Sequence, residues 1–352
     1  MTRANDPRGT AIALSFGYFD RPSAKTAHGL IRGGERFDII GLVDSKLRLP
    51  SAKWPVLPPV FASVAEALRA LPVRPQFAIV GVAFTGGRLP EAFRADIAMV
   101  LRAGVSVVSG LHELLGEDAE FRAAAEAGGA AIYDVRKPRP WSELRFWNGD
   151  IFDVRAPVVA VLGTDCALGK RTTARLAVEG CRARGLNAHM IYTGQTGWMQ
   201  GGRYGFVLDA TLADFVAGEL EGAVLRCDRA ERPDLILLEG QSSLRNPAGP
   251  CGSWFMLSAN ARAVVLQIAP NRKYYAGRVA IPRVEDEIAL IARYGSRVIC
   301  VAVNEDGMAA DAADALRDRL ERELGIPVVF PLRSMEGLTE CLAQYVESCR
   351  VS

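Results

Sequence analysis

Short apolar runs rich in β-branched residues alternate along the chain with segments in which Ala, Leu and Arg recur at helical spacing. This alternation of strand and helix is typical of α/β proteins with parallel sheets, and it predicts that fold class here. In the first half it predicts strands at 11–15, 37–43, 77–82, 105–108 and 130–134, and helices at 24–32, 63–70, 94–103 and 119–127.

A stretch rich in Pro and Gly interrupts the periodicity between residues 136 and 153, which indicates a linker or a crossing loop. The continuous apolar run at 157–162 then predicts a strand buried on both faces, where a second α/β unit begins. That unit is predicted to contain strands at 188–192, 235–238, 263–268, 298–303 and 328–330, and helices at 171–182, 211–225, 285–294 and 309–324. We therefore expect two domains, over 1–150 and 151–352.

The first domain resembles a Rossmann-like fold, although no Gly-x-Gly-x-x-Gly follows its first strand. Asp44 ends the strand at 37–43, at the place where dinucleotide-binding folds keep an acid that binds the ribose. Because the glycine pattern is missing, we expect this domain to serve mainly as a scaffold and cleft wall.

Composition and net charge exclude several classes of protein. The 352 residues are 49% apolar and 23% charged with a net charge of +2, which excludes a disordered chain and a bulk basic surface for nucleic acid. Seven cysteines without a CxxC pair indicate a reducing compartment. The start of the chain is polar, and no apolar run approaches a membrane span. We expect a cytoplasmic enzyme that acts on a small molecule, forms a homo-oligomer, and binds neither nucleic acid nor membrane.

The most informative motif follows the strand at 157–162 and leads into a helical pattern. The order of strand, glycine-rich loop, Gly-Lys and helix start predicts a phosphate-binding loop, so the second domain is expected to be P-loop NTPase-like. Glycines let backbone N–H groups converge on an oxyanion, and the lysine supplies a charge. The residues assigned to phosphate binding are Gly163, Thr164, Ala167, Leu168, Gly169, Lys170, Arg171, Thr172 and Thr173.

This loop departs from the usual P-loop in two ways. Five residues separate Gly163 from Gly169 instead of four, and Arg171 stands where NTPases place the hydroxyl that binds Mg²⁺. A metal site is therefore displaced to Thr172 or missing. A second cation beside Lys170 favours holding a pyrophosphate over cleaving one.

Other candidate residues follow predicted strands or open a helix. Glu239 ends the strand at 235–238, at the sheet edge where a catalytic carboxylate or metal ligand is expected, although a capping carboxylate is the plainer alternative. The stretch 193–199 is either part of the ligand site or a β-turn. Gln195 is a further candidate for catalysis, and the candidates for substrate binding are Lys25, His28, Thr196, Gln241, Ser243 and Arg245.

Several of these motifs together resemble the D-glutamate N-acetyltransferase-like family, with a P-loop domain related to the dethiobiotin synthetase group. The matching stretches are 24–30 (AKTAHGL), 107–113 (VVSGLHE), 134–138 (DVRKP), 163–173 (GTDCALGKRTT), 193–197 (TGQTG), 214–218 (DFVAG) and 239–244 (EGQSSL). The resemblance spans residues 10 to 335 and implies acetyl transfer from acetyl-CoA to the amine of D-glutamate. Arg171 is usual in this family, whereas Asn246 stands where the family usually has histidine.

The resemblance also implies roles for the candidate residues. The P-loop would hold the pyrophosphate of acetyl-CoA, Glu239 or Asp165 would accept the ammonium proton, and donors at Gln195 or Gln241 would stabilise the oxyanion. Lys25 and Arg245 would pair with the substrate carboxylates, and no metal is expected.

Two other function classes stay open. The first is an ATP- and Mg²⁺-dependent ligase or phosphotransferase similar to dethiobiotin synthetase, with Thr172, Asp165 and Glu239 as metal ligands. The second is a nucleotide sensor without turnover.

Overall fold

The computed structural model describes residues 6–47, 54, 56–275 and 277–351, so the polar start of the chain considered above lies outside it. The chain forms two compact units, Met1–Arg139 with Gln195–Arg203 and Pro140–Gly194 with Tyr204–Ser352. The expected domain change after residue 150 stays a prediction. The assignment of Gln195–Arg203 to the first unit was not anticipated from the sequence.

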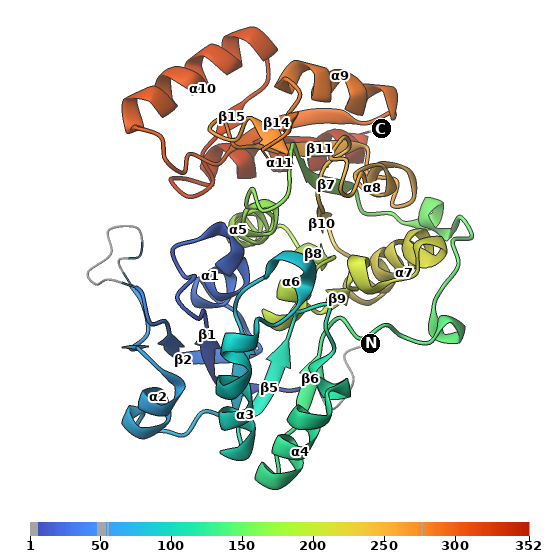
Figure 1. The fold of residues 1–352 in the computed structure, drawn as a ribbon. Helices are drawn as coiled ribbons and strands as arrows, with labels where there is room; N and C mark the ends of the chain where they lie inside the picture. Colours follow the sequence, from blue (N-terminus) through green and yellow to red (C-terminus); the bar gives the residue numbers. More distant parts are fainter. Residues whose placement is uncertain (1–5, 48–53, 55, 276, 352) are drawn as a thin grey trace. The chain divides into compact units, whose positions relative to one another are not determined.

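The first unit contains a parallel six-stranded sheet with the strand order β3-β2-β1-β4-β5-β6 (Figure 1). This is the strand order of a Rossmann-like fold, which confirms the predicted architecture. The strands are β1 (Gly9–Leu14), β2 (Phe37–Val43), β3 (Val60–Phe61), β4 (Phe77–Val80), β5 (Ser106–Ser109) and β6 (Ile132–Asp134). The helices include α1 (Lys25–Ile31), α2 (Val64–Ala70), α3 (Arg94–Arg102) and α4 (Ala119–Gly128).

Asp44 at the end of β2 is a structural residue in this unit. Its buried carboxylate accepts hydrogen bonds from Ser15 Oγ at 2.7 Å and from the N–H groups of Phe19, Lys46 and Leu47 at 2.8–3.0 Å. These four donors occupy both carboxylate oxygens. The residue that a dinucleotide-binding fold would use for the ribose therefore holds together the loops after β1 and β2.

Residues Gln195–Arg203 include α6 (Gln195–Met199) and pack within the first unit. Thr196 Oγ1 lies 2.9 Å from Thr26 Oγ1, and Gln200 Nε2 donates to the carbonyls of Gly29 and Gly33. Gly34 allows this close approach, because a Cβ there would lie 3.2 Å from the Gln200 Cα. The segment after Gly194 is thus a docked helix rather than a β-turn.

The second unit contains a parallel seven-stranded sheet with the order β15-β14-β11-β7-β10-β8-β9. The strands are β7 (Val158–Gly163), β8 (Ala188–Tyr192), β9 (Tyr204–Gly205), β10 (Leu235–Glu239), β11 (Ala263–Ile268), β14 (Arg297–Val303) and β15 (Val328–Val329). The helices are α5 (Lys170–Ala183), α7 (Ala213–Glu231), α8 (Ser253–Leu257), α9 (Val284–Arg293), α10 (Ala310–Leu324) and α11 (Glu336–Val351). An antiparallel pair, β12 (Tyr274–Tyr275) and β13 (Val279–Ala280), stands apart from the sheet.

Two apolar cores lie on opposite faces of this sheet. Alternate residues of β7 enter each core, which explains why this strand reads as continuously apolar. The helices α5 and α11 contribute to one core, and α7, α8, α9 and α10 contribute to the other. Because helices cover both faces of the sheet, the loops that follow the strands lie at its carboxyl edge.

The segment 145–151 is tied to α7 by the fully buried Glu221. The Glu221 carboxylate accepts the N–H groups of Asn148, Gly149 and Ile151 at 2.9–3.2 Å, and it pairs with the Arg145 guanidinium. Gly218 on the same helix lets the segment approach, since a Cβ there would lie 2.1 Å from the carbonyl oxygen of Arg145.

We expect Glu221→Gln to lower the free energy of unfolding by about 2 kcal/mol, because it removes the charge of a buried carboxylate paired with the partly exposed Arg145 and turns an amide N–H₂ toward N–H donors. Urea unfolding measures the change. The matched control is Glu179→Gln, which removes an exposed ion pair with Arg175 on α5 and should change stability by less than about 0.5 kcal/mol. Equal stability of the two variants would contradict the assignment.

Candidate functional site

The predicted P-loop connects β7 to α5 and leaves backbone N–H groups without helical partners. The first N–H at this end of α5 to bond back to the loop is that of Thr173, which donates to Gly169 O at 2.9 Å. Ala167 (φ 52°) and Gly169 (φ 104°) adopt left-handed conformations. Consecutive N–H groups in such a turn at the start of a helix are the usual donors to an anion, so the backbone here has the form that the predicted phosphate-binding loop requires.

Lys170 joins this loop to the loop after β10. Its buried ammonium donates to the carbonyls of Asp165 at 2.6 Å and Ser242 at 2.8 Å. Gly163 provides the space, because a Cβ there would lie 2.9 Å from Gln267 O and 3.2 Å from Lys170 Cδ. The lysine is therefore held under the loop in a defined position.

The hydroxyls that follow Lys170 are placed differently from those of a metal-binding P-loop. Arg171 occupies the position of the usual Ser or Thr. The buried Thr173 donates its hydroxyl proton to Gln267 Oε1 at 2.6 Å. On the other side of the loop, Asn304 Nδ2 donates to Leu168 O at 2.9 Å. Gln267 and Asn304, from the ends of β11 and β14, were not expected from the sequence.

The Asp165 carboxylate is held by three donors. It accepts from the N–H of Cys166 at 2.7 Å, from Asn246 Nδ2 at 2.8 Å, and from the Arg272 guanidinium at 3.2 Å. These three hydrogen bonds fix the loop, because they join Asp165 to Asn246 and to Arg272. Both oxygens of the Asp165 carboxylate are therefore engaged.

Glu239, Thr193 and Gln241 form a second polar group, where the adjacent strands β8 and β10 end. Glu239 Oε2 accepts the N–H of Thr193 at 3.0 Å, and the Thr193 hydroxyl donates to Glu239 O. Gln241 Nε2 donates to Thr193 Oγ1 at 3.1 Å. Gly194 leaves space beside this group, because a Cβ there would lie 3.0 Å from Gln241 Nε2 and 3.5 Å from Glu239 Oε1. The structure thus brings together two of the predicted residues, Glu239 and Gln241.

Ser243 and Arg245 have structural partners. Ser243 Oγ accepts the N–H of Asn246 at 2.9 Å and lies 3.3 Å from the hydroxyl of Tyr275, whose pKa is raised by burial. Arg245 contacts the buried Glu287 through Nε at 2.8 Å and Nη2 at 2.7 Å.

Burial raises the pKa of the nearby Cys251 thiol to about 11, so this cysteine is protonated at neutral pH.

The remaining predicted site residues belong to the first unit. Lys25 opens α1, and His28 Nε2 lies 2.6 Å from Phe19 O. The buried Gln195 accepts a hydrogen bond from Arg136 Nη2 at 3.1 Å, and Thr196 contacts Thr26 as described above. Their roles in substrate binding or catalysis stay predictions.

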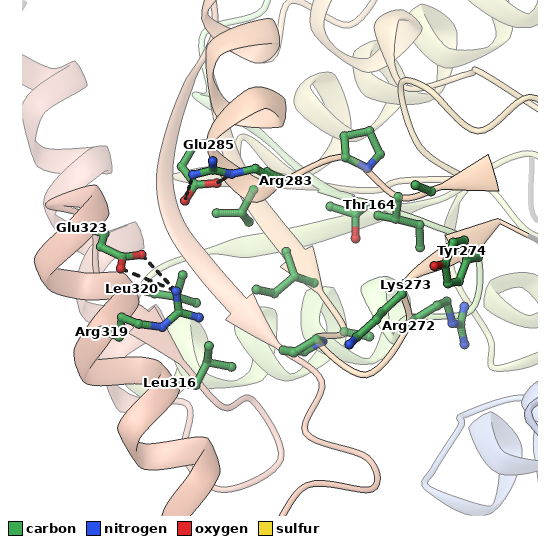
Figure 2. A pocket seen from close by; sticks show the side chains of 17 residues that line it. Thr164, Arg272, Lys273, Tyr274, Arg283, Glu285, Leu316, Arg319, Leu320 and Glu323 are labelled. Atoms are coloured by element: carbon green, nitrogen blue, oxygen red, sulfur yellow. Dashed lines mark hydrogen bonds and ion pairs between the residues drawn. The ribbon is translucent and has the colours of Figure 1, made fainter.

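A cavity of about 820 Å³ lies next to the P-loop within the second unit (Figure 2). It is lined by Thr164 of the loop, by the segment after β11, by the start of α9 and by α10. This cavity could not be predicted from the sequence, because its walls come from elements up to 160 residues apart.

Among the described residues, none of the helices combines the length and the hydrophobicity that a membrane-spanning helix needs. No group of three or more His, Cys, Asp or Glu side chains there is arranged to hold a metal ion.

Comparison with known proteins identifies the family. A model described as the P-loop domain of DUF1611, a domain of unknown function, matches residues 145–339, and its Rossmann-like N-terminal counterpart matches residues 52–138. The chain belongs to the DUF1611 family. A crystal structure of a DUF1611 family protein from Anabaena variabilis has a TM-score of 0.86 and 26% identity to it, covering 96% of this chain and 99% of that one.

Two curated relatives of this DUF1611 chain are each named D-glutamate N-acetyltransferase. The one from Tritonibacter scottomollicae is 30% identical over 275 residues, 75% of this chain and 80% of the relative. The one from Pseudoalteromonas is 27% identical over 264 residues, 72% of this chain and 77% of the relative. The family resemblance inferred from the motifs is thereby confirmed.

We expect Lys170→Ala to weaken the binding of inorganic pyrophosphate at least tenfold, because an ammonium hydrogen bond to an anion contributes about 1.5–3 kcal/mol. Isothermal titration calorimetry measures the dissociation constant. Lys137→Ala, which removes an exposed lysine of the first unit, should leave it unchanged. Unaltered affinity in Lys170→Ala would show that the loop does not hold phosphates.

Proposed function

We propose that this protein is an N-acetyltransferase that moves the acetyl group of acetyl-CoA to the amine of D-glutamate. The names of the two curated relatives support the reaction. The role that we give to the loop rests on two observations. Arg171 stands where the metal-binding hydroxyl of a P-loop is expected, and the Thr173 hydroxyl is already bonded to Gln267. Such a loop is suited to holding a pyrophosphate rather than to transferring a phosphoryl group.

The loop fits the pyrophosphate of coenzyme A. Its N–H groups from Ala167 onward supply donors, the dipole of α5 favours negative charge, and Lys170 and Arg171 supply two cations for the charges of the diphosphate. This neutralisation makes a divalent cation unnecessary for binding in our proposal.

The polar group at the ends of β8 and β10 fits the acyl transfer step. Glu239 takes a proton from the ammonium group of the acceptor, and the free amine attacks the thioester carbonyl carbon. The N–C bond forms, the C–S bond breaks, and the leaving thiolate takes up the second proton that the attacking nitrogen loses as the amide forms. Gln241 Nε2 has two protons and donates one of them to Thr193, so the second can donate to the carbonyl oxygen as it becomes negative.

The reaction is tested by incubating the purified protein with acetyl-CoA and D-glutamate. We expect release of the free thiol, followed with a disulfide reagent, and formation of N-acetylglutamate, identified by mass spectrometry. L-Glutamate serves as the stereochemical control. Turnover of ATP with Mg²⁺ and no thiol release would instead support the ligase class.

We expect Glu239→Gln to lower kcat by about 10²- to 10⁴-fold while leaving the KM for acetyl-CoA within about twofold, because the amide cannot accept the ammonium proton. Glu179→Gln is again the control with unchanged rates. A kcat for Glu239→Gln equal to that of the unaltered protein would remove Glu239 from the mechanism.

The proposed reaction also favours a cytoplasmic location. The seven cysteines of the chain are all free, which suits the reducing cytoplasm where acetyl-CoA is available. Light scattering of the purified protein tests the homo-oligomer predicted from the sequence.

A further inference from the structure

The cavity beside Thr164 and the polar group at the ends of β8 and β10 lie on opposite sides of the P-loop. The strand that leads into the loop, β7, pairs with β10 on one side and with β11 on the other. Glu239, Thr193 and Gln241 follow β10 and β8, whereas Ile268, the last residue of β11, lines the cavity. Neighbouring strands are about 5 Å apart, so the loop stands between two nearby sites on one sheet edge.

This arrangement excludes the cavity as the place where the acceptor amine reacts. Within the described part of the chain, its lining includes none of Glu239, Thr193 and Gln241. A ligand group in the cavity is therefore remote from the reaction. Coenzyme A has such a group, because its diphosphate stands between the adenosine 3′-phosphate and the arm that ends in the thiol. With the diphosphate on the loop and the thioester near Glu239, the adenosine lies on the side of β11.

The lining has the chemistry of a site for a nucleoside. Ile268, Leu316 and Leu320 belong to its apolar part, against which a flat base can pack. Tyr274, which is 54% exposed, lies across the cavity from α10 and offers an aromatic face for stacking (Figure 2). The volume of about 820 Å³ lies in the range of ordinary ligand sites and accommodates a nucleoside with its phosphate.

The charged side chains of the lining favour an anion. Four of them are basic and two are acidic, namely Arg272, Lys273, Arg283 and Arg319 against Glu285 and Glu323. Because Arg272 also pairs with Asp165 outside the lining, at least one positive charge is in excess. These side chains are exposed or partly exposed, so they act through a field that salt screens. A 3′-phosphate, with nearly two negative charges at neutral pH, suits such a field.

We propose that the cavity beside Thr164 binds the adenosine 3′-phosphate end of acetyl-CoA. The base packs between the apolar lining and Tyr274, and the phosphate lies in the positive field. This inference rests on the proposed acetyltransferase function and adds to it the site of the nucleotide. The coenzyme then crosses the loop, and the acceptor binds on the side of Glu239.

The test measures the binding of coenzyme A and of inorganic pyrophosphate by isothermal titration calorimetry. In Leu316→Trp the indole fills part of the cavity, so we expect the Kd for coenzyme A to rise about tenfold or more. The Kd for pyrophosphate, which needs only the loop, should stay within about twofold. Asp318→Trp, at an exposed position of α10 that does not line the cavity, is the matched control. Thermal unfolding verifies that both variants are folded.

A second variant removes a contact instead of filling space. We expect Tyr274→Ala to raise the Kd for coenzyme A about fivefold or more, because a base loses its aromatic partner. In both variants the KM for D-glutamate should stay unchanged.

The phosphate is tested with 3′-dephospho-coenzyme A, which keeps the base, the diphosphate and the thiol arm. We expect it to bind the unaltered protein several-fold more weakly than coenzyme A at low ionic strength. The difference should shrink as salt is added, because the cations of the lining are exposed.

The outcomes separate this inference from the proposed function. If the protein binds coenzyme A but releases no thiol with any acceptor, the proposed reaction fails, and the binding comparisons alone decide the cavity. The assignment would be overturned by an unchanged affinity for coenzyme A in both Leu316→Trp and Tyr274→Ala, by equal affinities for coenzyme A and its dephospho form, or by a rise in the KM for D-glutamate alone. Loss of ATP binding in Leu316→Trp, in a protein that does not bind coenzyme A, would overturn both proposals.

Discussion

The buried ammonium of Lys170 is the interaction on which the candidate site depends. A buried charge is costly unless polar groups surround it, and here two carbonyls from different loops accept its protons. One of them belongs to Ser242, whose backbone is left-handed at φ 45°, a conformation that costs a non-glycine residue about 1 kcal/mol. The contact thus couples the loop after β7 to the strained loop after β10, and it positions both at one edge of the sheet.

The surroundings of this lysine separate phosphate holding from phosphate cleavage. A loop that cleaves needs a hydroxyl beside the lysine and free carboxylate oxygens for a metal. In this chain Arg171 replaces the hydroxyl, and the Asp165 oxygens are occupied by Asn246, Arg272 and the loop itself. These differences are the reason why the proposed function gives the loop a diphosphate that stays intact.

Much of the fold could be predicted because many of its strands differ clearly in composition from the residues on either side. The strands Phe37–Val43, Ala188–Tyr192 and Ala263–Ile268 match the predicted bounds, since polar and turn residues flank short, mostly apolar runs. The pair β12 and β13 was missed because two residues give no periodicity. The helix α11 was also missed, although Leu338, Leu342 and Val346 recur every four residues as a narrow stripe toward the core.

Only part of the candidate site could be predicted from motifs along the chain. The P-loop and Glu239 were recognised because each is marked by its own neighbours in sequence, whereas Arg272, Gln267 and Asn304 are marked by none. These three reach the loop only because β11 and β14 end at the same edge of a parallel sheet.

Asn246, which donates to Asp165, stands where a histidine is usual in the family that the sequence resembles. An amide donates to Asp165 without titrating, whereas the hydrogen bonding of a histidine changes near neutral pH. In this chain the side chain that donates to Asp165 is therefore an amide, which keeps its protons and its hydrogen bond through that pH range.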